Sequence, residues 1–301
     1  MTDRNFHSGY CAVIGRPNVG KSTLLNALIG EKLSIISDRP QTTRNKIQII
    51  YTDENMQVVF LDTPGVQTPI NSLGETMLVY SKESLKEADC IFMLFDCGPK
   101  GGRLDSQVLA LLDEIRDIPV VAILNKMDEV DEKTWKNRVE EYRREHHFYD
   151  VIPISAKEGR NLGVLKGTLF TLLPPGPMYY PSDMITDRSE RFLVSEIIRE
   201  KCLHLLRQEI PHGIFVGIDQ MKEGENKDSY DIHATVFVEQ KSHKGMVIGK
   251  GGAMLKKIGT LARKDIEKLL DAKVTLHLWV KIEKDWRKKK NKLRDFGYQE
   301  G

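Results

Sequence analysis

The feature that most constrains the fold is the segment GRPNVGKS at residues 15–22, which matches the pattern G-x-x-x-x-G-K-[ST]. It follows the apolar stretch YCAVIG and precedes KSTLLNALIG, whose apolar residues have helical spacing. Glycines in such a loop let backbone N–H groups point inward at a helix N-terminus, where an anion is stabilised. The segment therefore predicts a strand, a phosphate-binding loop and a helix, in that order.

Within this loop, the side chains divide between phosphate and metal. Lys21 supplies a positive charge for the β- and γ-phosphates, and Ser22 supplies an oxygen for Mg²⁺. The other residues that we assign to the phosphate cradle are Gly15, Asn18, Gly20 and Thr23.

Short apolar runs of strand length alternate with amphipathic segments in the first part of the chain. These runs are YCAVIG, KIQIIYT, QVVFLD, DCIFMLFD, PVVAILN and VIPISA. The alternation predicts an α/β domain with a mixed, mostly parallel sheet between helices. The polar DENM between the second and third runs predicts an antiparallel hairpin. Four prolines in LLPPGPMYYPSD end the pattern, so we assign residues 1–173 to this domain and 174–188 to a linker.

Three further motifs follow predicted strands. In DTPG (62–65), Asp62 is placed to hold the Mg²⁺ shell, and the Gly65 N–H to meet the γ-phosphate. In NKMD (125–128), the Asp128 carboxylate can accept hydrogen bonds from guanine N1–H and N2–H₂, two donors that adenine lacks. Ligands bind at the carboxyl ends of strands in open α/β sheets, so these motifs should meet at one edge.

The remaining base-binding residues come from the same motifs and from SAK at 155–157. Asn125 can bond the purine edge, the Lys126 stem can pack along the base, and the Ala156 N–H can point toward guanine O6. Ser155 and Lys157 flank Ala156 and are included in the nucleotide site. Taken in order, the motifs resemble the GTPase family, and GTP or GDP is the expected ligand.

The resemblance also implies how hydrolysis is controlled. PQTTRN (40–45) lies where the family has its first switch, and we favour Thr43 over Thr42 as the residue that reaches Mg²⁺. Ras-like relatives have a water-orienting glutamine after DTPG, but here the residue is Val66. Related GTPases with an asparagine at the position of Asn18 use it to hold K⁺. We therefore assign Lys21, Thr43, Gly65 and Asn18 to catalysis and expect slow turnover without an activating partner.

A second glycine-rich segment, VIGKGG at 247–252, has the pattern G-x-x-G but not the loop length or Lys-Ser of a nucleotide loop. Around it, from 189 to 283, we expect a helix, two strands, two helices and a strand. The glycine turn and this order of helices and strands resemble the type II KH domain, an α+β RNA-binding fold whose GXXG loop clamps about four nucleotides. The resemblance assigns residues 189–301 to this domain. RNA contact is expected at Ile248, Gly249, Lys250, Gly251, Gly252, Lys256 and Lys257.

Charge supports a polyanion site in this part of the chain. Residues 241–294 contain 17 Lys and Arg against 5 Asp and Glu, although the net charge of the chain is only +2. The basic segment 281–294 is expected to add phosphate affinity beside the GXXG turn. Trp286 within it could stack on a base, but packing onto the sheet is the favoured interpretation. The four cysteines show no metal-ligand spacing, and Cys11 and Cys90 lie in apolar runs that predict buried thiols.

Taken together, the two domains resemble the Era family of ribosome-assembly GTPases. The resemblance rests on segments that extend over nearly the whole chain: GRPNVGKSTLLN, PQTTR, DTPG, NKMD, SAKEG, ITDRSERF, SEIIREK, MVIGKGG and LRDFGY. It implies a GTPase that binds small-subunit ribosomal RNA near its 3′ end and acts in assembly of that subunit, with no DNA partner expected. GTP would favour the RNA-binding arrangement of the two domains, and hydrolysis would favour release.

Other functions fit parts of the sequence. One is a constitutive RNA-binding scaffold whose nucleotide site is structural; another is a phosphate-loop ATPase or nucleotide kinase, against which NKMD argues. A GTPase acting in tRNA modification or at membranes is a weaker variant. The absence of an apolar N-terminal segment leads us to expect a cytoplasmic protein. Through the basic residues 281–294, a fraction of the protein could also associate peripherally with anionic membrane.

Overall fold

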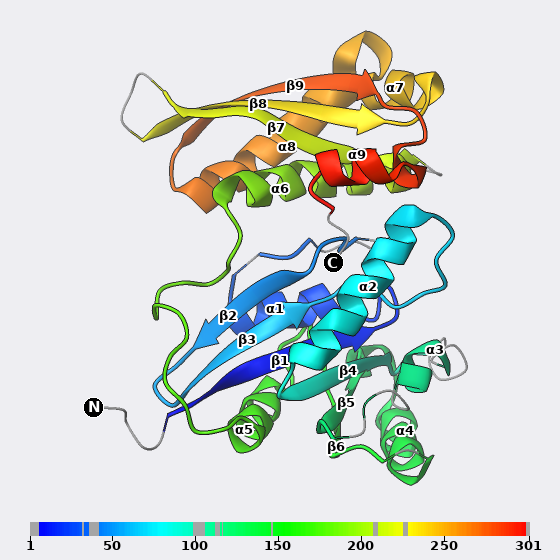
Figure 1. Ribbon diagram of the computed structural model, residues 1–301, viewed down its shortest axis with the longest axis vertical. Helices are drawn as coiled ribbons and strands as arrows, with labels where there is room; N and C mark the ends of the chain where they lie inside the picture. The colour runs from blue at the N-terminus through cyan, green and yellow to red at the C-terminus, as the bar shows by residue number, and fades with distance from the viewer. Residues whose placement is uncertain are drawn as a thin grey trace.

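Two domains lie one above the other along the long axis of the molecule (Figure 1). The computed structural model describes residues 6–31, 33–35, 42–98, 106–111, 115, 117–145, 147–206, 210–224 and 228–298.

The first domain is an α/β domain built on one six-stranded sheet. Its strands are β1 (His7–Gly15), β2 (Ile47–Thr52), β3 (Met56–Asp62), β4 (Cys90–Asp96), β5 (Val120–Asn125) and β6 (Asp150–Pro153). Its helices are α1 (Lys21–Ile29), α2 (Ser72–Glu87), α3 (Ser106–Leu109), α4 (Glu132–Glu145) and α5 (Leu162–Leu172). The strand order is β2-β3-β1-β4-β5-β6. All pairings are parallel except that of β2 with β3, so the predicted fold class and hairpin are confirmed.

The side chains of β1 alternate between the two faces of the sheet, and both faces are covered by helices. Cys11 and Val13 of β1 belong to one buried cluster with residues of α1 and α5. Ala12 and Ile14 belong to the other, with residues of α2, α3 and α4. A parallel strand buried on both sides has no face in contact with solvent, so its sequence is a continuous apolar run. Cys11, Cys90, Cys97 and Cys202 are all buried and free, as expected for the first two.

The segment SQVLALLDEIR, expected to be a helix, is only partly described. Helix α3 covers Ser106–Leu109, and residues 112–114 and 116 lie outside the described residues.

The segment that we predicted as a linker runs between α5 and α6 along the edge of the first sheet. Ile50 of β2 donates its N–H to the carbonyl of Ile185 at 2.9 Å. The Gln57 side chain of β3 accepts from the backbone N–H groups of Tyr179 and Tyr180. These bonds attach the proline-rich segment to the first domain.

The second domain has one three-stranded sheet backed by helices. Its main elements are α6 (Glu190–Leu205), β7 (Phe215–Glu223), β8 (Ser229–Val238), α7 (Lys241–Ile248), α8 (Ala253–Leu270), β9 (Lys273–Ile282) and α9 (Lys290–Asp295). Strand β8 is central, antiparallel to β7 and parallel to β9. The predicted order of helix, two strands, two helices and strand is therefore confirmed. Among the helices that the structure describes, none combines the length and apolar character that a membrane span needs.

The alternation of β8 decides which residues of this sheet reach the core. Ile232, Ala234 and Val236 are fully buried against α6 and α8, whereas the intervening residues point to the opposite face. Helix α8 has a strongly one-sided apolar pattern, with Ile258 and Ile266 buried. Its lysine-bearing face is left exposed.

Candidate nucleotide and RNA sites

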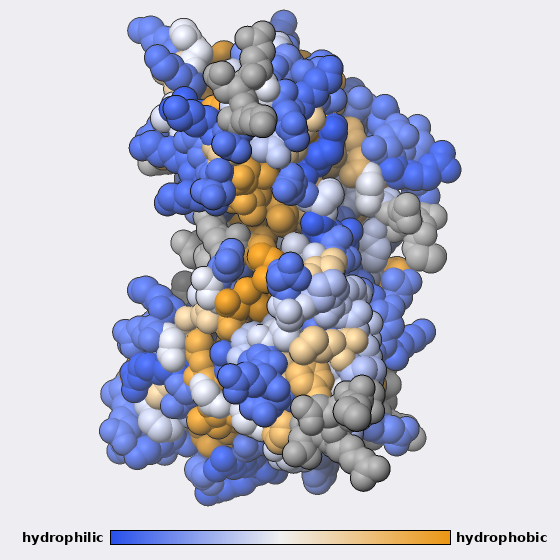
Figure 2. Space-filling model, turned by 90° about the vertical axis from the view of Figure 1, so that its left-hand side faces the viewer, coloured by the Kyte–Doolittle hydropathy of each residue, from blue (hydrophilic) through white to orange (hydrophobic). Residues whose placement is uncertain are grey.

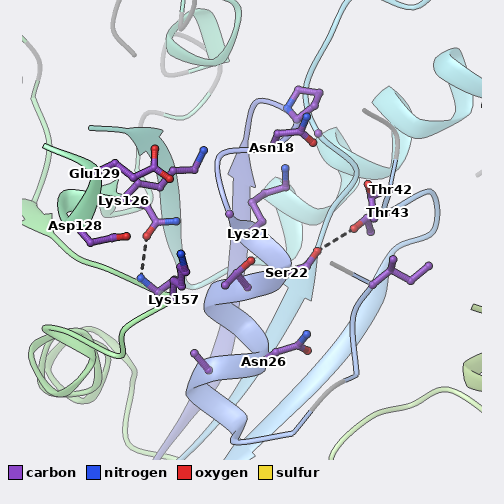
Figure 3. Close-up of a pocket in the computed structure, with 18 residues that line it drawn as sticks. Asn18, Lys21, Ser22, Asn26, Thr42, Thr43, Lys126, Asp128, Glu129 and Lys157 are labelled. Carbon is purple, nitrogen blue, oxygen red and sulfur yellow. Dashed lines mark hydrogen bonds between the residues drawn. The ribbon is translucent and has the colours of Figure 1, made fainter. Parts of the chain in front are cut away.

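The phosphate loop and the base-binding motifs surround one cavity of about 650 Å³ at the carboxyl edge of the first sheet (Figure 3). Its walls come from the loop before α1, the segment after α1, the DTPG motif and the loops after β5 and β6. The predicted residues that line it are Asn18, Gly20, Lys21, Ser22, Thr23, Thr43, Gly65, Asn125, Lys126, Asp128, Ala156 and Lys157. Gly15, Asp62 and Ser155 are buried and are not among the residues that line it.

The phosphate loop has the conformation that the sequence pattern requires. Asn18 and Gly20 have φ angles of 65° and 100°, so the chain curls at these points before α1 begins at Lys21. The Lys21 ammonium donates to the carbonyls of Gly15 and Arg16, at 3.1 Å each. Burial lowers the pKa of Lys21 to about 8, although the Asp62 carboxylate opposes this shift. An anion in the cavity would stabilise the charged form of the lysine.

Two glycines are needed because of close neighbours. A Cβ atom at Gly20 would lie 2.2 Å from Nδ2 of Asn125, and one at Gly65 would lie 2.7 Å from the backbone nitrogen of Pro17. The phosphate loop therefore packs directly against both the base-binding motif and the DTPG motif. Any side chain at these points would push the motifs apart.

The expected magnesium ligands meet at one side of the cavity. The hydroxyl oxygens of Ser22 and Thr43 are 3.2 Å apart. Asp62 accepts a hydrogen bond from Ser34 on Oδ2 at 2.9 Å, whereas its buried Oδ1 has no hydrogen-bond partner within the described part of the chain. Burial raises the pKa of Asp62 to about 6, and the nearby Lys21 charge limits the rise. Two hydroxyls and a carboxylate with an unpaired oxygen fit Mg²⁺, which prefers oxygen ligands.

Asn125 joins the base-binding motifs to the phosphate loop. Its Nδ2 donates to the Val19 carbonyl at 2.8 Å, and its Oδ1 accepts from the Ala156 N–H at 3.0 Å. The Ala156 N–H, which we expected to point toward guanine O6, is thus engaged with Asn125 in this structure. Asn125 acts mainly as the residue that positions the two loops, and a contact from Ala156 to the base would have to be shared with this bond.

Asp128 is the residue best placed to select the base. It points into the cavity (Figure 3), and its buried Oδ1 makes no hydrogen bond with any described residue. A buried carboxylate oxygen without a donor is costly unless a ligand provides one. The neighbouring Lys126 pairs with Asp96 at 2.8 Å, which holds its stem along the cavity wall. Guanine can supply its N1–H and N2–H₂ groups as hydrogen-bond donors to this carboxylate.

The position after DTPG contributes no polar group to the cavity. Val66 is 6% exposed and packs in the core of the first domain, while its N–H donates to the Gly15 carbonyl at 3.1 Å. The expectation that this residue cannot orient a water molecule agrees with its position.

An arginine next to the first switch enters the second domain. Arg44 follows Thr43 directly and is 1% exposed. Its guanidinium donates to the carbonyls of His212 at 2.9 Å and Ile214 at 2.5 Å, and lies 5.7 Å from the ring centre of Trp286. The nucleotide cavity and the second domain are therefore connected through two adjacent residues. In the reverse direction, Arg199 of α6 donates to the carbonyl of Thr42.

The C-terminal segment completes this interface. Trp286 is fully buried, donates its indole N–H to the Gly213 carbonyl at 2.9 Å, and packs in a cluster with Leu73 and Met77 of α2. Its packing interpretation is therefore confirmed, but the contact extends to the first domain as well as to the second. Figure 2 shows apolar residues continuing as a band from the upper domain into the lower one.

Part of the basic segment 281–294 is paired within the second domain. Arg287 pairs with Glu239 at 2.5 Å, and Lys289 and Lys292 lie 3.9 and 3.7 Å from Glu283. This segment contributes to the domain interface through Trp286 and through Leu293, which lies in α9. Fewer of its charges are available for phosphate than the sequence suggested.

Two of the predicted RNA-binding residues, Gly252 and Lys256, line a groove of about 640 Å³ between α8 and β9. It is lined by Gly252, Leu255, Lys256, Gly259, Thr260, Arg263, Val274, Thr275, Leu276 and Leu278. At its end, Gly249, Gly251 and Gly252 all have positive φ, so the GXXG turn leads directly into α8. Lys250 and Lys257 are exposed but are not part of the groove lining, and neither is Ile248, which packs against the core of the domain.

Several residues of these sites were missed from the sequence. Arg263 and Thr260 lie in the groove at helical spacing from Lys256, a periodicity that could have identified them. Asn26 binds the backbone of Leu33 and Ser34, and so holds the segment that brings Ser34 to Asp62. Arg44 carried no local signal, because its partners are about 170 residues away.

Comparison with known proteins identifies both domains. A family model described as "50S ribosome-binding GTPase" matches residues 10–126, and a KH domain model matches residues 209–287. GTPase Era of Alkaliphilus metalliredigens is 50% identical over 295 residues, covering 98% of this chain and 100% of the relative. GTPase Era of Clostridium botulinum is 48% identical over 294 residues, covering 98% and 99%.

Two solved structures match along both domains. One is Era in complex with MgGDPNP and nucleotides 1506–1542 of 16S ribosomal RNA, with a TM-score of 0.91, 38% identity, and coverage of 97% of this chain and 99% of that one. The other is a variant of Aquifex aeolicus Era bound to GDP·AlF₄⁻, with a TM-score of 0.92, the same identity and the same coverage. Fold and site define the class as a phosphate-loop GTPase carrying a KH domain. At this identity over nearly the whole of both chains, the protein belongs to the Era family of GTPases.

Proposed function

We propose that this protein is a GTP-hydrolysing switch that binds the 3′ region of small-subunit ribosomal RNA and assists small-subunit assembly. GTP occupies the cavity beside Asp128, and single-stranded RNA occupies the groove between α8 and β9. The Era complex with 16S ribosomal RNA supports this proposal, as does the full-length similarity to Era proteins.

The observation that carries the proposal is the connection between Thr43 and Arg44. Thr43 lies beside Ser22 at the metal side of the cavity, and the next residue is buried against His212 and Ile214 of the second domain. A change in the first switch therefore moves a group on which the second domain is packed. A constitutive scaffold would not need this arrangement.

The residues around the cavity stabilise charge and exclude competing ligands. Mg²⁺, when bound, neutralises charge on the β- and γ-phosphates. Lys21 and the loop N–H groups bind the phosphates, Asp62 and Ser22 hold the metal side, and Asp128 selects guanine. Because Val66 cannot orient water, we expect basal turnover on the order of 10⁻⁴–10⁻² s⁻¹, as in GTPases without a supplied catalytic group.

RNA binding in three nucleotide states tests the proposal. The probe is a single-stranded RNA with the small-subunit 3′ sequence, measured with a non-hydrolysable GTP analogue, with GDP and without nucleotide. We expect the tightest binding with the GTP analogue, and by linkage the RNA should tighten GTP binding by the same factor. Equal affinity in all three states would instead support the scaffold, and displacement of GTP by equimolar ATP would support an ATPase.

We propose that K⁺ supports hydrolysis through Asn18, which lines the cavity and has the positive φ angle that turns it into the loop. Hydrolysis in K⁺ should exceed that in Na⁺ for the natural protein. An Asn18→Asp variant should lose this difference, and equal rates in both salts for the natural protein would remove K⁺ from the mechanism.

We propose that the protein works in the cytoplasm, where GTP and ribosomal RNA are present, with a peripheral membrane fraction only at low salt. The ion pairs within 281–294 reduce the charge available to anionic lipid. Sedimentation with phosphatidylserine vesicles should therefore decline between low and physiological salt. Binding that persists at high salt would contradict this.

A further inference from the structure

A group of potential metal ligands lies on the face of the second sheet that points away from α6 and α8. It consists of Asp231 and His233 of β8 and His277 of β9. His233 and His277 are direct neighbours in the parallel register, and Asp231 is two residues before His233 on the same face. The three ligand atoms all lie within 4.8 Å of one another.

The distances approach those of a bound first-row divalent cation. The Nε2 atom of His233 is 3.1 Å from Oδ2 of Asp231, and Nε2 of His277 is 3.3 Å from Oδ1. Around tetrahedral Zn²⁺ with bonds of about 2.0–2.1 Å, neighbouring ligand atoms lie roughly 3.3 Å apart. The three ligand atoms are therefore close enough together to share one cation.

The carboxylate is not fully used by the protein. Asp231 Oδ1 is buried and forms no hydrogen bond with the described residues, although His277 Nε2 is close to it. A buried carboxylate oxygen without a hydrogen-bond partner is stabilised by a cation at this position. The histidine side chains remain 32% and 48% exposed, so an ion could reach them from solvent.

The surroundings hold the ligands in place. Strands β8 and β9 pair continuously from Ser229 and Lys273 to Val238 and Ile282, so the backbone positions of all three ligands are restrained. Trp279 packs beside both imidazoles, with ring centres 5.2 Å from His233 and 6.0 Å from His277. Lys222 of β7 is the register partner of Asp231 on the neighbouring strand.

We propose that Asp231, His233 and His277 form a binding site for a Zn²⁺-class divalent cation. Two imidazoles and a carboxylate are the ligand set that Zn²⁺ accepts when a fourth position stays open to water or to a ligand from a partner. His277 lies on the side of β9 opposite Val274, Leu276 and Leu278 of the RNA groove, whereas Thr275 of the groove is the register partner of Asp231. Occupancy of the metal site is therefore measured directly, by metal binding to the protein without RNA.

Calorimetric titration of the full chain with ZnCl₂ tests the site, with excess Mg²⁺ and GDP present to fill the nucleotide cavity. We expect one Zn²⁺ per chain. His277→Ala and His233→Ala should each weaken binding by at least about 10–100-fold, the loss found even when only a supporting residue is removed. His147→Ala, which removes an exposed histidine of the first domain, is the matched control and should bind as the natural protein does.

A second measurement does not depend on removing a ligand. Ni²⁺ should quench the fluorescence of Trp279, and the quenching should be absent in Trp279→Phe while Zn²⁺ binding persists. The proposal is overturned if His277→Ala retains the natural Zn²⁺ affinity, if His147→Ala loses as much, or if Ni²⁺ quenches Trp279→Phe to the same extent.

Discussion

Arg44 offers the most direct test of the proposed control of the RNA site by the nucleotide site. Its guanidinium makes two charge-assisted hydrogen bonds to backbone carbonyls of the second domain and one cation–π contact with Trp286. Such hydrogen bonds contribute about 1.5–3 kcal/mol each. A desolvated cation–π contact adds up to about 2 kcal/mol. Coupling between two sites is typically about 1–3 kcal/mol, or 5–150-fold in affinity, so this contact is large enough to carry it.

We predict that Arg44→Ala brings the ratio of RNA affinities with the GTP analogue and with GDP close to unity. If the two RNA affinities still differ by roughly 2-fold, the remaining hydrogen bond from Arg199 to the Thr42 carbonyl accounts for it. Affinity for GTP itself should change little, because Arg44 does not line the cavity. Arg44→Lys should retain part of the ratio, since one ammonium cannot reproduce the planar fork of a guanidinium.

The assay is fluorescence anisotropy of labelled RNA at fixed salt in each nucleotide state, with circular dichroism to verify folding. Arg191→Ala is the matched control, because Arg191 also donates to a backbone carbonyl, that of Ile218, but within the second domain. A folded Arg44→Ala protein that keeps the natural affinity ratio would falsify the assignment of coupling to this residue.

Three further predictions concern the two binding sites. Asp128→Asn should weaken GTP binding by at least about 100-fold and improve binding of xanthosine triphosphate in a competition assay, because the carboxylate that pairs with guanine is lost. Gly20→Ala should lower GTP hydrolysis by about 100-fold, since its methyl group would displace Asn125; Gly163→Ala, with open space around it, is the control. Lys250→Glu should weaken RNA binding and reduce the slope of log affinity against log salt by about 0.7.

Each of these predictions has a result that contradicts it. An unchanged preference for guanine over xanthine in Asp128→Asn would remove Asp128 from base selection. Equal hydrolysis by the Gly20→Ala and Gly163→Ala proteins would show that the loop tolerates a side chain. For Lys250→Glu, the comparison is Lys133→Glu on α4; an equal loss in both would mean that the effect is general electrostatics.

Local motifs were predictable because their function depends on backbone shape over a few residues. Gly20 and Lys21 lie where the pattern requires, since a strand, a tight loop and a helix N-terminus follow one another in the chain. The hairpin of β2 and β3 and the GXXG turn were predictable for the same reason. In contrast, the engaged Ala156 N–H and the packing of Ile248 against the core depend on neighbours that no short pattern specifies.

The sequence by itself determined the two domain types, the expected nucleotide base and the location of the GXXG turn. Each is encoded by adjacent residues whose geometry is set by local backbone preferences. Only the tertiary structure placed Arg44 and Trp286 in one interface, and only the register of β8 with β9 brought His277 beside His233. These contacts join residues separated by tens to hundreds of positions, and their formation depends on how buried surfaces pack, which local preferences do not specify.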